Sequence, residues 1–394
     1  MRIGRWAQVL LAAAPLLAGC AGFWDAPSNS GGTTPTTLSS GNFYILNVGA
    51  TSSSIVGYSI VSGTLTQMTG SPFAITGQAW SMAINPAGTY LYVSSSTGIY
   101  SYPITASTGV LGGATQLYGD LTALAIKVDP AGAWLLDASG LGSLYAIPIT
   151  SSGILDTTRL VNSLPPSTTL SAATVQQMTI TANGNLIAVA LGSTGVELFP
   201  FNTALSGAGN SPIGTAYTNL ITPSGTGGSS IAVAADPQNR MLYVGETAAF
   251  PSSTTGNSGG LRTFVIGSGS LTELKTGSPT ASGGTGPHSI LPLANGDYVY
   301  VGNWAGSSTG NITGFQVTSS GSTYALTLQT NTAATGTQPS GLAEDNKSNF
   351  VLAVSNGGSP QFDAYIFDTT TTGKLDASVT GSTGAGPIAV VAAP

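Results

Sequence analysis

The chain has 394 residues, a formal net charge of −6 and only 6% charged residues, whereas soluble domains usually carry ~25%. Phosphate binding needs a clustered basic surface, and beyond residue 20 the Lys and Arg residues are scattered singly, so we expect no nucleic-acid partner. Glycine (54 residues) and proline (22 residues) stay below the share that marks low-complexity disorder, and a hydrophobic content of 41% can build a large core.

Residues 1–19 have the pattern of an export signal. Two arginines precede an apolar stretch from Trp6 to Leu17 that is too short to span a membrane. The stretch ends in Leu17-Ala18-Gly19-Cys20, which resembles a bacterial lipobox, so we predict cleavage before Cys20 and lipidation of its sulfur. The alternative is a spare thiol in an ordinary signal peptide. Cys20 is the only cysteine of the chain, and an orphan thiol is a liability in an oxidising compartment, which favours lipidation.

Residues 20–41 are rich in Ser, Thr, Gly and Pro and contain hardly any apolar pairs. Such a segment cannot order itself by burial, so we predict a flexible tether that spans on the order of 25 Å. Because no aspartate follows Cys20 directly, we expect an envelope lipoprotein of the outer membrane that faces the periplasm or the exterior.

A pair of apolar strands joined by a tight turn returns along the rest of the chain. In its clearest copy, Ser289–Leu293 and Tyr298–Val301 flank a turn that contains Asn295 and Gly296. No stretch has apolar residues at helical spacing behind an N-cap, so the pattern predicts an all-β protein. The other copies of the hairpin are Ser81–Val93, Leu124–Ala138, Gln177–Ala190, Ile231–Val244 and Ser340–Val354.

Each hairpin is followed by a third strand, and the third strands recur every 44 to 65 residues. After most of them a glycine precedes a short fourth strand, as in Gly153-Ile154-Leu155 and Gly373-Lys374-Leu375. A repeat of this length with four short strands is typical of a β-propeller blade. Phe43–Val48 has the pattern of a second strand without a first, and Ile388–Val391 that of a first strand without a second. We therefore predict a seven-bladed β-propeller over residues 42–394, whose last blade is closed by the N-terminal strand.

The propeller pattern resembles the seven-bladed lactonase-type propellers related to bacterial 6-phosphogluconolactonase. The matching residues form short structural motifs. These are Gly70-Ser71-Pro72-Phe73, Gly277-Ser278-Pro279, the turns Asn85-Pro86-Ala87-Gly88, Asp129-Pro130-Ala131-Gly132 and Asp236-Pro237, and the Leu-Tyr-Val strands at Leu91 and Leu242. The resemblance covers residues 42 to 394. It implies the fold and, less specifically, a lactone hydrolase.

A lactonase needs a general base and a group that stabilises the oxyanion of the opening ester. His288, the only histidine, precedes a first strand near the predicted centre of the ring, and Glu246 follows a second strand. These two residues are the candidate catalytic groups. The enzymes of the family carry an arginine between the proline and the histidine of this segment, and here Pro287 is followed directly by His288. The usual cationic partner is therefore missing.

Asn303, Trp304 and Asn356 are candidate ligand-binding residues, because the repeat places the two asparagines at the ring level of Glu246, and more loosely Asp137 and Asn47. We expect no cofactor and no metal; the alternative is a calcium ion of the gluconolactonase type on Glu246 and the asparagines, which are oxygen donors. Each of these residues also has a plain structural explanation, since Asn commonly forms turns and Trp commonly packs between blades.

Two functions remain open. The near-absence of ionisable residues favours a monomeric module that binds a glycan, a small molecule or a protein on the propeller face. The family resemblance favours hydrolysis of an unphosphorylated sugar lactone. Three longer insertions, Leu160–Ala173, Ala204–Gly228 and Ala248–Gly260, are where we expect specificity to reside.

Overall fold

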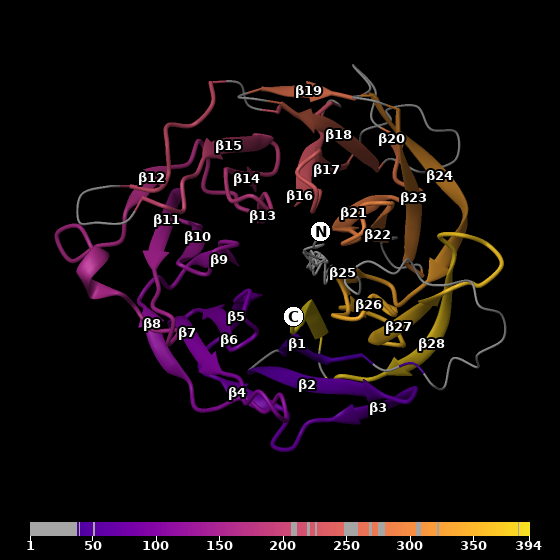
Figure 1. The fold of residues 1–394 in the computed structure, drawn as a ribbon, viewed down its shortest axis with the longest axis horizontal. Coiled ribbons are helices and arrows are strands. Elements are labelled where there is room, and N and C mark those ends of the chain that lie inside the picture. The colour runs from indigo at the N-terminus through magenta and orange to yellow at the C-terminus, as the bar shows by residue number, and fades with distance from the viewer. Residues whose placement is uncertain are drawn as a thin grey trace, which may run out of the picture.

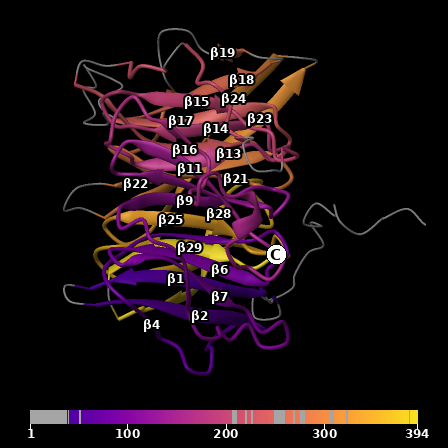
Figure 2. The same ribbon diagram turned by 90° about the vertical axis from the view of Figure 1, so that its left-hand side faces the viewer.

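Seven β-sheets stand side by side around a central axis in the computed structural model of the chain (Figure 1). The structure describes residues 38, 40–49, 52–205, 211–218, 221–224, 227–247, 259–267, 270–274, 280–304, 309–320, 323–384 and 386–394. The inner strands of each sheet run roughly along the axis of the ring, whereas the outer strands are turned toward its plane, as the twist of a sheet requires (Figure 1 and Figure 2). The predicted export signal and Cys20 lie outside the described residues.

Each sheet is one blade, and the strands of a blade follow one another from the centre of the ring outward. Blades 1 and 2 contain β29 (Gly386–Ala392), β1 (Asn42–Val48), β2 (Ser53–Val61) and β3 (Thr64–Gln67), with β4 (Phe73–Ile75) beside β2, and β5 (Ala79–Ile84), β6 (Tyr90–Ser95), β7 (Gly98–Pro103) and β8 (Thr115–Tyr118). Blades 3 and 4 contain β9 (Ala123–Val128), β10 (Trp134–Ser139), β11 (Ser143–Pro148) and β12 (Ser167–Thr169), and β13 (Gln177–Ile180), β14 (Leu186–Ala190) and β15 (Val196–Pro200). Blade 5 contains β16 (Ser229–Ala235), β17 (Met241–Thr247), β18 (Gly260–Ile266) and β19 (Leu271–Glu273), with β20 (Thr280–Ala281) beside β18. Blades 6 and 7 contain β21 (Gly286–Pro292), β22 (Tyr298–Trp304), β23 (Asn311–Ser320) and β24 (Thr323–Ala334), and β25 (Pro339–Glu344), β26 (Phe350–Ser355), β27 (Phe362–Phe367) and β28 (Leu375–Gly381).

The two ends of the described chain pair within blade 1. β1 runs antiparallel to β29, with Phe43 opposite Ala392 and Ile45 opposite Val390. The predicted closure of the ring by its N-terminal strand is therefore confirmed. The backbone amide of Ser40 donates to the carbonyl of Ile60, so this residue, which the sequence assigned to the tether, already binds blade 1.

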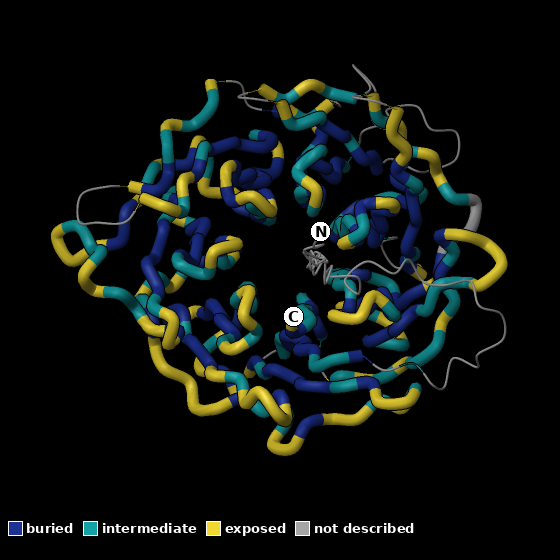
Figure 3. Tube along the Cα trace, viewed as in Figure 1, coloured by how far each residue is buried: buried dark blue, intermediate teal, exposed yellow. Residues whose placement is uncertain are grey.

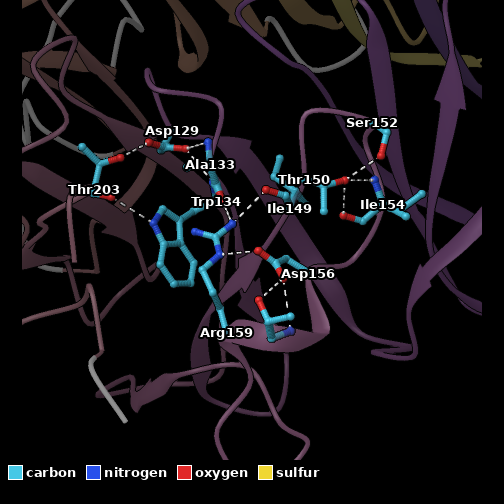
Figure 4. Close-up of polar contacts among 11 residues, drawn as sticks. Asp129, Ala133, Trp134, Ile149, Thr150, Ser152, Ile154, Asp156, Arg159 and Thr203 are labelled. Carbon is cyan, nitrogen blue, oxygen red and sulfur yellow. Dashed lines mark hydrogen bonds and ion pairs between the residues drawn. The ribbon is translucent and has the colours of Figure 1, made fainter. Parts of the chain in front are cut away.

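The turn between the first and second strands is built by one side chain. In blade 3, Asp129 Oδ1 accepts hydrogen bonds from the backbone amides of Ala133 and Trp134, both at 2.7 Å (Figure 4). The carboxylate thereby replaces the water that would otherwise satisfy the amides at the turn. Asp129 also binds the hydroxyl of Thr203, and Trp134 Nε1 donates to the carbonyl of Thr203, so the same turn ties blade 3 to blade 4.

The core is divided into seven apolar clusters among the described residues, one between each pair of neighbouring blades. Figure 3 shows buried residues along the strands in the middle of each blade and exposed residues in the connecting loops. Between blades 1 and 7, the rings of Phe43 and Phe362 stack with centroids 5.1 Å apart. A blade has no core of its own, because each face of its sheet is covered by a neighbour.

The outer strands depart from the sequence pattern in blades 2, 3 and 4. In blade 2 the pattern predicts a fourth strand at Gly109-Val110-Leu111, but Leu111 forms a single bridge to Ile104 and the fourth strand is β8. In blade 3, Leu155 forms a single bridge to Ile149, and the fourth strand is β12, reached through the 3-10 turn η2 (Thr157–Arg159). In blade 4, the described residues after β15 form single bridges at Ile213 and Ile221 rather than a strand. Insertions of this kind shift the outermost pairing without disturbing the buried strands. In the parts of the chain that the structure describes, no helix has the length and apolarity to cross a membrane.

Closure of blade 1 generates a prediction for Val390, which is 6% exposed between blades 1 and 7. Val390→Asp places an unpaired carboxylate there and should lower the free energy of unfolding by about 3 kcal/mol or more, measured by urea denaturation. The matched control is Val61→Asp, at a strand position that is 54% exposed, where we expect less than about 1 kcal/mol. Equal losses in the two variants would contradict a closure that depends on β29.

Candidate functional site

His288 occupies a special position of the first strand. In the pairing of β21 with β22, Gly286 lies opposite Trp304 and Pro287 opposite Asn303, but the next pair is Ser289 with Gly302. His288 has no residue opposite it and is therefore the extra residue of a β-bulge. A bulge turns one side chain out of the regular alternation. The innermost strands of five further blades have an extra residue at the equivalent position: Trp80, Leu124, Ile231, Ser340 and Ile388.

The imidazole of His288 lies flat against the indole of Trp304, with ring centroids 3.5 Å apart and an interplanar angle of 16°. Trp304 Nε1 donates to the carbonyl of Pro339 at 2.9 Å, which fixes the indole between blades 6 and 7. Burial lowers the pKa of His288 to about 4, so the imidazole is neutral at pH 7. Among the described residues, none forms a hydrogen bond with the imidazole. The two residues therefore form one aromatic platform, which we call the His288–Trp304 stack.

The sixth residue of the second strand is of the same kind in six blades. It is a buried polar residue at Asn47, Ser95, Ser139, Glu246, Asn303 and Ser355. In most of these blades its side chain binds the incoming loop, by which we mean the loop that leads into the first strand of the same blade. The level that the repeat predicted for Glu246, Asn303 and Asn47 is thus correct. Asn356 comes one residue later and Asp137 two residues earlier.

Glu246 is fully buried and its carboxylate is fully engaged. It accepts hydrogen bonds from the backbone amide and the hydroxyl of Ser224 in the incoming loop, at 3.0 and 2.7 Å. It also forms an ion pair with Arg262 Nη1 at 3.0 Å. Gly245, which precedes Glu246 on β17, faces the segment that contains His288. A Cβ atom built on Gly245 would lie 2.7 Å from the carbonyl oxygen of Pro287. Side chains alternate along a strand, so Glu246 points away from His288.

Asn303 is 1% exposed, and its amide nitrogen donates to the carbonyl of Ser282 and to Asn311 Oδ1, both at 3.0 Å. Asn356 is exposed at the end of β26, against the start of β29. These two side chains and Glu246 therefore serve separate blades and do not fit one calcium ion. Within the described residues, no three His, Cys, Asp or Glu side chains form a group that could hold a metal. Of the candidate residues, the structure brings together only His288 and Trp304.

Asp137 has a partner that sequence reasoning missed. Both of its carboxylate oxygens are buried without a hydrogen-bond donor among the described residues, and so is Oδ2 of Asp120 in the incoming loop of blade 3. Asp120 Oδ1 accepts from the amide and hydroxyl of Thr122. Burial first, and then the Asp120 carboxylate, raise the pKa of Asp137 well above its usual range. A proton on Asp137 lets it donate to Asp120, so the two acids can share one hydrogen bond.

The shared proton generates a prediction for pH dependence. The pKa of Asp137 is raised in the folded state, so its stabilising contribution to the free energy of unfolding is fully present below the pKa of the unfolded chain, 3.8. This contribution is lost as the pH rises through the pKa of the folded state. Asp137→Asn supplies an N–H donor at every pH. It should be close to neutral near pH 4 and stabilising by about 1–3 kcal/mol near pH 8, measured by urea unfolding. Asp297→Asn, at an exposed position, is the control. Destabilisation by Asp137→Asn across the whole range would exclude the shared proton.

Comparison with known proteins supports the fold and its family. Residues 43–392 match the family described as lactonase, 7-bladed beta-propeller. A candidate 6-phosphogluconolactonase from Bacteroides fragilis NCTC 9343 is similar in structure, with a TM-score of 0.65 and 13% identity over 91% of this chain and 99% of that chain. The periplasmic gluconolactonase of Pseudomonas aeruginosa has a TM-score of 0.60 and 17% identity over 89% of this chain and 100% of that chain. Curated protein sequences contain no match.

Sequence identities of this size show the common fold of the solved structures and nothing of their activity. The family match is a separate observation, and it extends from β1, where Phe43 begins it, to Ala392 at the end of β29. It thus includes both strands that close the ring. The chain belongs to the seven-bladed β-propeller lactonase family.

Proposed function

We propose that this propeller binds a small, uncharged, sugar-like ligand at the His288–Trp304 stack and does not hydrolyse it. The observation that carries the proposal is the geometry of the stack. An aromatic surface fixed by the bond from Trp304 to Pro339 offers a flat apolar face to a ring. A neutral imidazole adds ring-nitrogen donor and acceptor capacity without a charge.

The arrangement offers little to acid–base catalysis. A general base must lie within hydrogen-bond reach of the proton it removes and needs a pKa near the working pH. Glu246 is 0% exposed and already binds Ser224 and Arg262, and a histidine with a pKa of about 4 is a weak base. The segment also lacks an arginine beside His288 that could stabilise an oxyanion.

Hydrolysis of an unphosphorylated sugar lactone is the second candidate. Membership of the lactonase family favours it, as does the similarity to the periplasmic gluconolactonase of Pseudomonas aeruginosa. In this alternative His288 would activate the water directly, because it is the one candidate base that is partly exposed.

Two substitutions of His288 separate the candidates. His288→Phe keeps an aromatic ring on Trp304 but removes the ring nitrogens, whereas His288→Ala removes the ring. With D-glucono-1,5-lactone as probe, binding predicts that His288→Phe retains most of the affinity and that His288→Ala loses about tenfold, measured by calorimetry. The purified protein should not accelerate lactone opening above the spontaneous rate. Turnover by the wild type that both variants abolish would establish the enzyme and refute the binding module.

We also propose that the propeller is displayed in the cell envelope, at the outer membrane, by a lipid on Cys20. The lipobox-like Leu17-Ala18-Gly19-Cys20 and the lack of any other cysteine support this. Acyl chains bind a bilayer in proportion to the methylenes they bury. In cells, Cys20→Ser should move the protein from the membrane fraction to the soluble fraction and remove the mass of the lipid. The control is Ser28→Ala, in the same segment. A Cys20→Ser variant that stays with the membrane would refute the anchor.

A further inference from the structure

A cavity of about 860 Å³ lies between blades 4 and 5, away from the His288–Trp304 stack. Its volume is in the range of pockets that hold small molecules. Leu186 and Leu198 of blade 4 form one wall, and Phe264 and Ile266 of β18 form the other. It reaches the turns between the first and second strands of both blades, where Asn185 and Asn239 lie.

In the described part of blade 4, no regular fourth strand covers β15 on the side of the cavity. The described residues of the insertion after β15 contact this strand at two separate points. The backbone amide of Tyr217 donates to the carbonyl of Leu198, and Ile221 forms a single bridge with Val196. An irregular segment cannot fill the space against β18 and β19 as a flat strand does. The same insertion, 204–228, gives the longest spacing in the repeat, 65 residues between the third-strand markers Phe199 and Phe264.

The lining combines buried apolar side chains with an amide and a hydroxyl group that make no hydrogen bond to a described residue. Leu198, Ile221 and Phe264 of the walls are only 5–8% exposed. At the mouth, Asn185 is exposed, and its side-chain amide makes no hydrogen bond to another residue that the structure describes. The hydroxyl of Tyr217 is likewise without a described partner. An apolar face with amides and hydroxyls at its edge matches the two kinds of surface on a sugar ring.

The electrostatics of the cavity disfavour an anion. Arg262, the cation that lines the cavity, donates four hydrogen bonds to protein acceptors. Two go to the carboxylate of Glu273, both at 2.8 Å, one to Glu246 at 3.0 Å and one to the carbonyl of Thr222 at 2.7 Å. A guanidinium has five N–H donors, and here one positive charge faces two negative ones. The guanidinium is therefore committed to the protein, and a phosphate or carboxylate ligand would meet no free positive charge.

From this lining we infer that the cavity between blades 4 and 5 is a second binding site, which takes an uncharged mono- or disaccharide. The ligand lies with its apolar face on Phe264 and Leu198 and its hydroxyls on Asn185 and Tyr217. The site is independent of the proposed function of the His288–Trp304 stack, since the two share no residue.

The test is a binding panel on the purified protein, read by saturation-transfer NMR and calorimetry. The probes are methyl α-D-glucoside, maltose and cellobiose, with D-glucuronate and glucose 6-phosphate as charged counterparts. We expect at least one uncharged probe to bind and the charged ones to bind about tenfold more weakly or not at all. Asn185→Ala should weaken binding about fivefold, because one or two hydrogen bonds are lost. Ser270→Trp, at an exposed lining residue, should block the cavity.

The controls separate this site from the other one. Asn346→Ala removes an exposed amide from the turn between the first and second strands of blade 7 and should leave saccharide binding to the cavity unchanged. His288→Ala removes the stack and identifies any saccharide binding that occurs there. Unfolding curves exclude misfolding of the variants. The inference is overturned if no uncharged probe binds, if the charged probes bind as well as the uncharged ones, or if Asn185→Ala and Ser270→Trp both leave binding unchanged.

Discussion

The pairing of β1 with β29 is the contact on which the rest of the structure depends. A blade of this protein has no interior, and its apolar side chains are buried only when a neighbour stands on each side. An open ring would leave two sheet faces in water, with Phe43 and Phe362 among the residues exposed. Because closure joins the first and last strands, blade 1 cannot be completed before the chain is nearly complete, which makes this part of the fold strongly non-local.

A second constraint follows from the first, since each incoming loop crosses from one blade to the next and must be held at the axis of the ring. Here a buried polar side chain at the sixth position of the second strand does this, and Glu246 and Asn303 are two examples. Buried polar groups need partners, and the loop carbonyls and hydroxyls supply them. Residues with the chemistry of a catalytic site are thus used in the framework, and the His288–Trp304 stack is left partly exposed.

The sequence was sufficient to predict the inner strands, the number of blades and the closure of the ring, because these features depend on an alternation of apolar residues that is repeated many times. It was weaker for side-chain contacts. Glu246 and Asn303 were placed at the correct level, yet their direction depends on Arg262 and on loops of remote sequence. Asp120 and Asp137 come together across an incoming loop, which periodicity cannot show. In blades 2 and 3 the fourth strand lies further along the chain than the pattern predicts, and in the described part of blade 4 single bridges replace it. Outer strands bury little and therefore carry a weak apolar signal.

The scarcity of charge connects these features to function. The ion pairs of Arg262 with Glu246 and Glu273 are internal to the framework, so the two proposed sites offer aromatic, amide and hydroxyl groups to a ligand. Such surfaces recognise uncharged rings by stacking and by neutral hydrogen bonds, which are individually weak and therefore suit reversible binding. Irregularity in a single blade is enough to add a site, because the remaining blades and the closure carry the fold. A propeller can thus vary its ligands blade by blade while its ring stays the same.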